Sequence, residues 1–301
     1  MIDLRSMTTE ARNTASLNLD ELSPLEVVSV MNAEDAKVPE AIKPHLSEIA
    51  QVVTWCTQSI KNGGRIIYTG AGTSGRLGIV DASECPPTFG VSPDLVVGLI
   101  AGGHGAIFKA VEGAEDSKDL GVEDLKAINL NENDIVIGLA ASGRTPYVIG
   151  GLEYANSLGC KTVSLSCNNN SEIGRVAKLK LEIIVGPEVL TGSTRLKSGT
   201  AQKLVLNMIT TATMVSLGKC YGNLMVDVMQ SNSKLVVRAQ NIVMDVTGVS
   251  REVAAETLDK AHDSVKVAIV MILADCNYEQ AIEKLQKADG HVRKAIAGIE
   301  K

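Results

Sequence analysis

The strongest constraint on the fold of this 301-residue chain is a glycine-rich stretch, Gly70 to Gly78, which reads GAGTSGRLG. It follows the apolar run Ile66-Ile67-Tyr68 and precedes a helical pattern, so it predicts a turn from a β-strand into a helix. Such a turn brings backbone N–H groups, the positive end of a helix dipole and the hydroxyls of Thr73 and Ser74 to one place. We expect this place to bind an anion, and a phosphate suits it best.

The order of strand, turn and helix repeats from Arg65 onward. Strands are predicted at residues 65–69, 95–100, 134–140, 161–166 and 180–185, with helices between them at 74–85, 105–128 (whole or broken) and 145–158. Apolar strands that alternate with helices predict an α/β fold, with a mostly parallel five-stranded sheet covered by helices on both faces. Ligands of such sheets bind at the carboxyl ends of the strands, where the glycine-rich turn lies.

Helical patterns flank the predicted sheet. Residues 1–20 are polar and aperiodic and predict an extended arm, after which Ser23-Pro24-Leu25-Glu26 predicts the start of a helix. Further helices are expected from Pro39 to Ile60 and near 199–216, 223–246, 250–261, 263–274 and 277–287, with a short one after Gly290. The pattern predicts two domains, a larger one at 1–247 and a small helical unit at 248–301.

Composition limits the classes of function. The net charge is −6 and only 3% of the residues are aromatic, which argues against nucleic-acid binding. The longest apolar runs are strand-sized or interrupted, so no segment is expected to span a membrane. Six cysteines are scattered without a C-x-x-C pair, and the N-terminus lacks the features of a signal peptide. We therefore expect a cytoplasmic protein with reduced thiols.

A second turn repeats the chemistry of the first. The sequence Ser142-Gly143-Arg144-Thr145 follows one predicted strand as Ser74-Gly75-Arg76 follows another. Each serine stands where a helix needs an N-cap, so the two turns are expected to converge on one ligand, although Ser-Gly is also ordinary turn chemistry. The predicted substrate contacts are Gly72, Thr73, Ser74, Ser142, Arg144 and Thr145, together with Ser193 and Lys197 if the polar loop 188–197 closes over the ligand rather than merely connecting two elements.

Two nucleotide-binding motifs do not fit the glycine-rich turn. Gly70, Gly72 and Gly75 match the spacing of the dinucleotide fingerprint, but that fingerprint also needs an acidic residue at the end of the second strand. Here the second strand runs into Ala101-Gly102-Gly103, and Asp94 lies at its other end. The Gly-Lys-Ser/Thr of a phosphate-binding loop is also absent. The hydroxyls of the turn favour a sugar phosphate instead.

Five blocks of the sequence resemble one enzyme family. They are Gly70–Gly78, Asp81–Pro87, Val111–Asp116, Ala140–Tyr147 and Thr191–Lys197. The chain resembles, over essentially its whole length, the N-acetylmuramic acid 6-phosphate etherases of the sugar isomerase (SIS) fold group. The resemblance implies a lyase that releases D-lactate from C3 of N-acetylmuramic acid 6-phosphate and leaves N-acetylglucosamine 6-phosphate. It implies a role in peptidoglycan recycling or amino-sugar catabolism, and no metal or other cofactor.

The resemblance assigns catalysis to two carboxylates, Glu84 and Glu115, with Glu112 as a rival to Glu115 in the block Val111–Asp116. The open-chain aldehyde at C1 acidifies the hydrogen at C2, so one base and one acid are enough to eliminate lactate before water adds at C3. Glu84 precedes Cys85-Pro86-Pro87, where its helix is expected to stop. A carboxyl at a helix C-terminus favours its protonated form, which suits the acid, and Glu115 is then the better candidate for the base.

The spacing of Ser74 and Glu84 presents a difficulty. The two are ten residues apart, or about 15 Å along a straight helix, and a hexose phosphate is too short to touch both. Either the helix breaks early or Glu84 serves the site of a second copy. SIS proteins commonly form dimers, so the resemblance favours a homodimer with shared active sites.

Other readings of the sequence remain open at this point. An aldose–ketose sugar-phosphate isomerase shares the abstraction of a proton at C2, and a sugar-phosphate-sensing regulator shares the fold. The C-terminal helices resemble a small ubiquitin-associated-like unit, although a packing or dimerisation role is simpler. The four histidines have no metal-ligand spacing, and His104 is a candidate to line the cleft because it follows a strand end.

Overall fold

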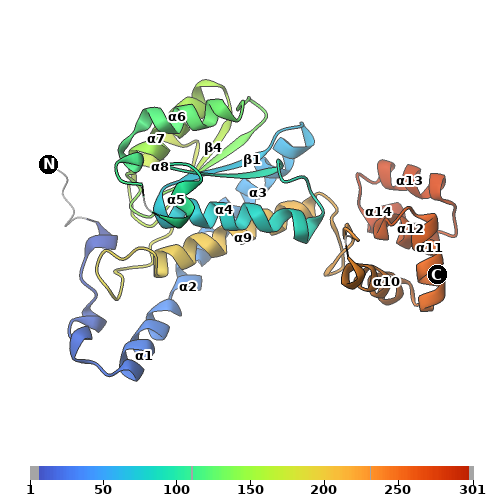
Figure 1. Ribbon diagram of the computed structural model, residues 1–301, viewed down its shortest axis with the longest axis horizontal. Coiled ribbons are helices and arrows are strands. Elements are labelled where there is room, and N and C mark those ends of the chain that lie inside the picture. The colour runs from blue at the N-terminus through green and yellow to red at the C-terminus, as the bar shows by residue number, and fades with distance from the viewer. Residues whose placement is uncertain (1–6, 110, 231, 298–301) are drawn as a thin grey trace. The chain divides into compact units, whose positions relative to one another are not determined.

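A computed structural model describes residues 7–109, 111–230 and 232–297 (Figure 1). The chain forms two compact units. The first comprises the residues up to Ser83 together with Pro93–Thr210, and the second comprises Glu84–Ser92 together with the residues from Thr211 onward. None of the helices in the described part of the chain is long and apolar enough to cross a membrane.

The first unit contains a five-stranded parallel sheet, as the sequence predicts. Its strands are β1 (Ile66–Gly70), β2 (Val96–Ile100), β3 (Ile135–Leu139), β4 (Lys161–Ser166) and β5 (Leu179–Glu182). Their order in the sheet is β2-β1-β3-β4-β5, so the chain reverses its direction of winding between β1 and β3. In open parallel sheets a ligand binds at the carboxyl ends of the strands beside this switch point.

Helices cover both faces of the sheet and confirm the three-layer α/β/α sandwich (Figure 1). On one face α6 and α7 bury a cluster that includes Ile67, Val136 and Leu152. The other face is covered by α3, α4 and α9. The helices that begin in this unit are α1 (Pro24–Asp35), α2 (Val38–Ile42), α3 (Leu46–Lys61), α4 (Gly72–Phe89), α5 (Gly105–Phe108), α6 (Lys118–Ala127), α7 (Pro146–Ser157), α8 (Glu172–Val176) and α9 (Lys197–Ser216).

Two predicted helices differ in the structure, and the structure decides between the two forms left open for 105–128. The helix expected from Pro39 to Ile60 is divided into α2 and α3 by the 3₁₀ turn Lys43–His45, which contains a proline that cannot donate a helical hydrogen bond. The segment 105–128 is broken into α5, the 3₁₀ turn Ala114–Asp116 and α6. The helix expected from residue 223 begins only at Ser233, because residues 220–225 form a small β-hairpin.

The N-terminal arm is folded rather than extended, as far as the described residues show; residues 1–6 lie outside them. It forms three short 3₁₀ turns, and Thr9, Asn13 and Ser16 are buried. The Asn13 Nδ2 donates to Glu34 Oε2 at 2.9 Å and to the Pro187 carbonyl at 2.9 Å. The sequence could not show this, since the partners that order the arm lie more than 20 residues away in the chain.

A buried ion pair joins α1 to the start of α9. Lys197 Nζ lies 2.6 Å from Glu34 Oε2, and the two side chains are 2% and 5% exposed. Burial alone would raise the pKa of the Glu34 carboxyl, but hydrogen bonds from Lys197, Lys37 and Asn13 outweigh it and lower this pKa from 4.5 to about 2. The carboxylate therefore stabilises the fold above about pH 4.5, and this contribution is lost as the pH falls toward 2.

We expect Glu34→Gln to lower the free energy of unfolding by about 3 kcal/mol, since it leaves the Lys197 ammonium buried without its counter-charge. Urea denaturation at pH 7 measures this loss. Glu40→Gln is the matched control, because Glu40 forms an ion pair with Lys43 in which both side chains are more than 70% exposed. Equal stability of the two variants would contradict the assignment.

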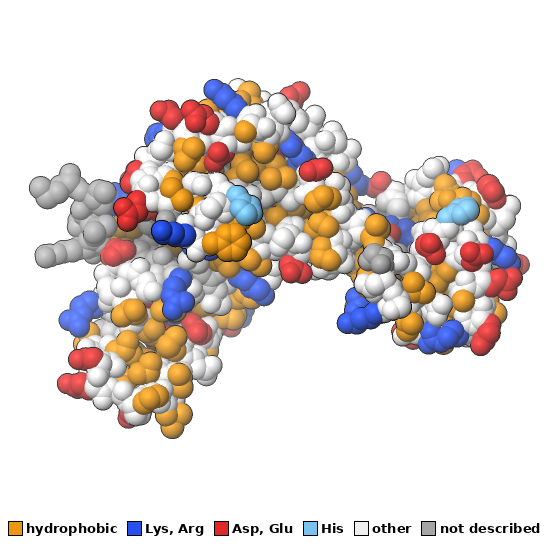
Figure 2. Space-filling model, in the orientation of Figure 1, with side chains coloured by type: hydrophobic (Ala, Val, Ile, Leu, Met, Phe, Trp, Pro, Cys, Tyr) orange, Lys and Arg blue, Asp and Glu red, His pale blue; other side chains and the backbone are white. Residues whose placement is uncertain are grey.

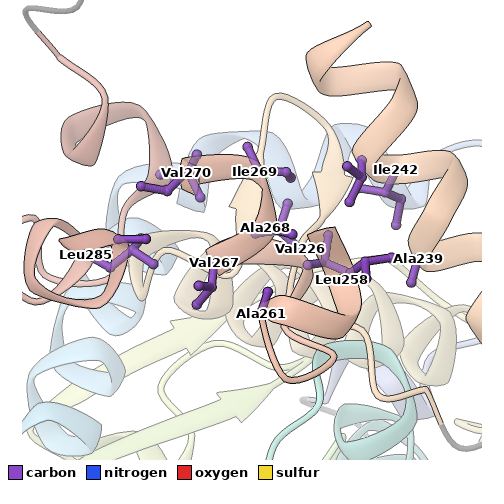
Figure 3. Packing of buried hydrophobic residues seen from close by; sticks show 14 of the residues in the cluster. Val226, Ala239, Ile242, Leu258, Ala261, Val267, Ala268, Ile269, Val270 and Leu285 are labelled. Carbon is purple, nitrogen blue, oxygen red and sulfur yellow. The ribbon is translucent and has the colours of Figure 1, made fainter. Parts of the chain in front are cut away.

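The second unit is built around its own apolar core (Figure 3). Val226, Ile242, Leu258, Ile269 and Leu285 are among its buried members. Its helices are α10 (Ser233–Thr247), α11 (Arg251–Lys260), α12 (Val265–Leu273), α13 (Tyr278–Lys287) and α14 (Val292–Ala295), close to the predicted bounds from residue 250 onward. Because α10 shares this core, the compact unit contains more than residues 248–301; the domain boundary at 247 and the ubiquitin-associated-like character stay predictions.

Candidate functional site

The two turns singled out in the sequence leave adjacent strands at the switch point. Gly70 at the end of β1 pairs with Leu139 at the end of β3. The first turn, Ala71 to Ser74, and the second turn, Ala140 to Thr145, therefore start side by side at the carboxyl edge of the sheet. This is the arrangement that convergence on one ligand requires, although the ligand contacts themselves stay a prediction.

Glycine is needed where α4 leaves β1. A Cβ at Gly75 would lie 2.7 Å from the Gly70 carbonyl oxygen and 2.7 Å from Cγ1 of Ile100, and a Cβ at Gly70 would lie 2.8 Å from the Gly75 nitrogen. The helix can approach the strand this closely only without those side chains. The first amides of α4, at Gly72, Thr73 and Ser74, have no acceptor within the helix, because they belong to its first turn.

The two hydroxyls of the first turn have different surroundings. Ser74 is buried and its Oγ donates to Oε1 of Gln202 on α9 at 3.0 Å, while Thr73 is half-buried. Among the described residues, the buried Nε2 of Gln202 has no hydrogen-bond partner. A buried amide donor beside the turn is an additional candidate for contact with ligand oxygens. Sequence reasoning missed it, because Gln202 lies 128 residues from Ser74.

The start of α9 is already occupied by a carboxylate of the chain. Glu188 accepts hydrogen bonds from the backbone nitrogens of Lys197 and Ser198, at 3.0 and 2.9 Å. Lys197 Nζ faces Glu34, in a separate cavity of about 240 Å³ lined also by Arg12 and Pro187. Ser193 is half-buried in its loop, with its backbone nitrogen bonded to the Leu190 carbonyl. The structure thus gives Lys197 an internal partner and does not bring it to the cavities at the two turns.

A polar cavity of about 350 Å³ lies at the second turn. Ser142 and Arg144 line it, and the Arg144 Nε donates to Glu172 Oε1 at 2.9 Å. The Ser142 Oγ accepts from the Arg144 backbone nitrogen at 3.3 Å, and Thr145 is the N-cap residue of α7. Apart from one methionine the remaining lining is polar or charged, with one carboxylate and one further arginine: Met7, Thr8, Asn168, Asn169, Asn170, Ser171, Glu172 and Arg175.

Glu115 lies in a smaller cavity of about 180 Å³ on the other side of the first turn. Gly72, Arg76, Glu112 and Glu115 all line this cavity, so the structure places Glu115 near the start of α4, while its catalytic role stays a prediction. Glu115 stands in the 3₁₀ turn Ala114–Asp116, which follows the loop after β2. Its rival Glu112 faces the same cavity, so position alone does not separate the two.

Glu84 stands on α4, exposed to solvent. The prediction that its helix stops at Cys85 is wrong, because α4 continues through Pro86 and Pro87 to Phe89. The prolines forfeit two helical hydrogen bonds, but the Gly90 nitrogen donates to the Pro86 carbonyl and completes the last turn. Glu84 is therefore five residues from the helix end, and the proposed influence of the dipole on its protonation loses its basis.

The unbroken helix excludes one of the two explanations for the distance between Ser74 and Glu84, namely that the helix breaks between them. Because α4 is helical from Gly72 to Phe89, the Cα atoms of Ser74 and Glu84 are separated by about 15 Å along its axis. An early break of the helix is excluded.

A buried carboxyl near Glu84 was not predicted. Asp81 is 5% exposed and accepts hydrogen bonds from the Tyr68 hydroxyl at 2.9 Å, Asn207 Nδ2 at 2.7 Å and the Thr210 hydroxyl at 3.2 Å. Burial raises the pKa of Asp81, although these donors oppose the shift. Through these hydrogen bonds Asp81, on α4, is linked to Tyr68 on β1 and to Asn207 and Thr210 on α9.

Histidines and charged surfaces add little to the site. His104 is exposed and lies 5.8 Å from the Phe108 ring, centroid to centroid. Across residues 7–109, 111–230 and 232–297, no three His, Cys, Asp or Glu side chains gather in a group that could hold a metal ion. On the face drawn in Figure 2, basic side chains are scattered among acidic and apolar ones rather than gathered into a patch.

Comparisons with known proteins agree with this architecture. A model of the glucokinase regulatory protein N-terminal SIS domain matches residues 48–156, and the SIS domain model matches residues 118–212. A phosphoheptose isomerase from Francisella tularensis aligns with 64% of this chain and all of its own, at a TM-score of 0.53 and 18% identity, which shows the shared fold.

Two curated relatives match nearly the full length. The N-acetylmuramic acid 6-phosphate etherase of Clostridium beijerinckii is 56% identical over 299 residues, 99% of this chain and 98% of its own. That of Bacillus cereus strain AH187 is 58% identical over 293 residues, 97% of this chain and all of its own.

Proposed function

The chain belongs to the N-acetylmuramic acid 6-phosphate etherases, and from this premise we propose how its residues share the work of the reaction. The enzyme is a lyase that cleaves the lactyl ether of N-acetylmuramic acid 6-phosphate. The products are N-acetylglucosamine 6-phosphate and D-lactate. The observation that carries the proposal is the cavity that brings Glu115 beside Gly72, at the start of the helix that offers free amides to a phosphate.

The substrate is held at the switch point of the sheet. The backbone amides of Gly72, Thr73 and Ser74, with the hydroxyls of Thr73 and Ser74, bind the phosphate. Ser142, Arg144 and Thr145 bind the same molecule from the turn that follows the neighbouring strand. Ser193 and Lys197 stay candidates for contact with the sugar only if the loop before α9 rearranges, because Lys197 is paired with Glu34. This arrangement fixes the sugar so that C2 and C3 face the carboxylates.

Without the dipole argument, the division of roles rests on position: Glu115 shares the cavity at the start of α4 and is assigned as the base, which leaves Glu84 as the acid. In the open-chain form the aldehyde at C1 acidifies the C2 hydrogen, and Glu115 removes it as a proton. The electron pair left on C2 forms the C2–C3 double bond while the C3–O bond breaks, and Glu84 gives its proton to the departing lactate oxygen. Glu84 then takes a proton from the water that adds at C3, and Glu115 returns a proton to C2, which restores both carboxyl groups to their starting states. The alkoxide leaving group never carries a full charge.

Glu84 comes from a second copy of the chain. In one copy, α4 holds Ser74 and Glu84 about 15 Å apart, farther than one hexose phosphate spans. A homodimer in which each site takes its anion-binding turn from one copy and Glu84 from the other meets both requirements.

We place this enzyme in the cytoplasm, because a phosphorylated sugar substrate and scattered cysteines suit that compartment. We place its reaction in peptidoglycan recycling.

Lactate release tests the function. Incubation with N-acetylmuramic acid 6-phosphate in H₂¹⁸O is expected to release D-lactate and to place one ¹⁸O at C3 of the sugar product. A sugar-phosphate isomerase of the same fold would release no lactate, and a sensor would convert nothing. No lactate from folded protein at high enzyme concentration would contradict the function.

A further inference from the structure

We propose that Arg76 is a positioning residue for the etherase reaction. It fastens the loop after β2 to the start of α4, and so sets Glu115 against the bound sugar phosphate. The inference rests on the proposed function of Glu115. Arg76 follows the anion-binding turn in the sequence, and in the structure its guanidinium is bonded to backbone carbonyls of the loop after β2.

The guanidinium of Arg76 holds two consecutive carbonyls of the loop. Its Nε donates to the Ile107 carbonyl at 2.7 Å and its Nη2 donates to the Ala106 carbonyl at 2.8 Å. Both carbonyls belong to α5, the single helical turn Gly105–Phe108. The last carbonyls of a helix have no donor within it, and the planar fork of an arginine can satisfy two at once. Arg76 therefore completes the C-terminal end of α5.

The loop has few other side chains with which to hold its shape. Glycine occupies positions 102, 103, 105 and 113, and three of these glycines have positive φ. The space at Gly102 is filled by Val111, whose Cβ would lie 2.7 Å from a Cβ at that glycine. Ala106 is buried at 3% exposure, under the contact with Arg76. Among the described residues, the backbone hydrogen bonds of the loop close only local turns, such as that from the Ala106 nitrogen to the Gly103 carbonyl, whereas the Arg76 guanidinium ties the loop to α4.

Arg76 is close both to the anion-binding turn and to Glu115, the proposed base. It follows Ser74 by two positions on α4, and it lines the cavity that Gly72, Glu112 and Glu115 share. The loop that it holds leads within a few residues to the 3₁₀ turn with Glu115. Because a displacement of about 1 Å at a reacting group costs about 10²-fold in rate, the tether is expected to act on kcat.

Two substitutions and one control test the inference. Arg76→Ala removes both hydrogen bonds, and Arg76→Lys keeps a charge that reaches one carbonyl at a time. Arg65→Ala is the control, because Arg65 also holds two consecutive carbonyls, those of Ile128 and Asn129, but stands before β1 at the amino edge of the sheet. It also removes the ion pair of Arg65 with the buried Asp134, so it tests whether a loss of stability away from the site affects catalysis. For each protein we would measure kcat and KM for D-lactate release, and amide hydrogen exchange over residues 102–109 and 111–116.

The expected result is a fall in kcat of about 10- to 100-fold for Arg76→Ala, with partial recovery in Arg76→Lys, a KM within about threefold of the wild type and faster exchange in the loop. Arg65→Ala should lower the melting temperature and leave both kcat and loop exchange unchanged. A rise in KM alone, or an unchanged kcat while the wild type is active, would overturn the inference. Absence of lactate release from the wild type would instead contradict the proposed function, and loop exchange would still report whether Arg76 holds the loop.

Discussion

Glu115→Gln is expected to lower kcat for D-lactate release by about 10²- to 10⁴-fold, the usual contribution of a general base. Glutamine keeps the size of the side chain and its place in the cavity with Gly72, but it cannot accept the C2 proton. Exchange of the C2 hydrogen of N-acetylglucosamine 6-phosphate in D₂O should fall by a similar factor, because it requires the same deprotonation.

Glu112→Gln is the matched control, because Glu112 lines the same cavity at a distance of three residues in the chain. We expect its kcat to stay within about threefold of the wild type. If Glu112→Gln loses both lactate release and C2 exchange while Glu115→Gln keeps them, the base has been assigned to the wrong carboxylate.

Glu84→Gln is expected to lower lactate release by about 10²- to 10⁴-fold while C2 exchange continues. The glutamine cannot protonate the departing oxygen, but the deprotonation at C2 does not involve Glu84. Since Glu84 is exposed, the fold should tolerate the change, and the melting temperature should stay near that of the wild type. Ser83→Ala, a change at the preceding exposed position, is the control for α4. Loss of C2 exchange in Glu84→Gln would contradict the division of roles.

The sheet could be predicted from the sequence because each strand is a short apolar run followed by a turn signal. The strands around Tyr68 and Ile137 are buried throughout, so their pattern is continuous and their bounds are correct to within one or two residues. The first turn could be predicted because it needs glycine: at Gly70 and Gly75, where α4 meets β1, there is no room for a side chain. The helices α11, α12 and α13 start after the N-cap residues Ser250, Ser264 and Asn277, which fits their predicted bounds.

The features that the sequence did not reveal depend on contacts between distant residues. Pro86 and Pro87 would end an isolated helix, yet α4 continues past them. The sequence predicts a substrate contact for Lys197 because it does not reveal the ion pair of Lys197 with Glu34, which lies 163 residues away in the chain. The role of Arg76 could not be predicted for the same reason, because its guanidinium donates to two carbonyls of a loop about 30 residues later in the chain. Local pattern identifies the turns, whereas the tertiary fold decides which polar groups near them are available.

In the proposed dimer, each active site needs Glu115 with the glycine-rich turn of one copy and Glu84 of the other. Mixing the inactive Glu84→Gln and Glu115→Gln proteins, with dissociation and reassociation, tests this directly. Mixed dimers would contain one site with both carboxylates intact, so random pairing should restore about a quarter of the wild-type lactate release. A mixture no more active than either variant alone would contradict the shared site.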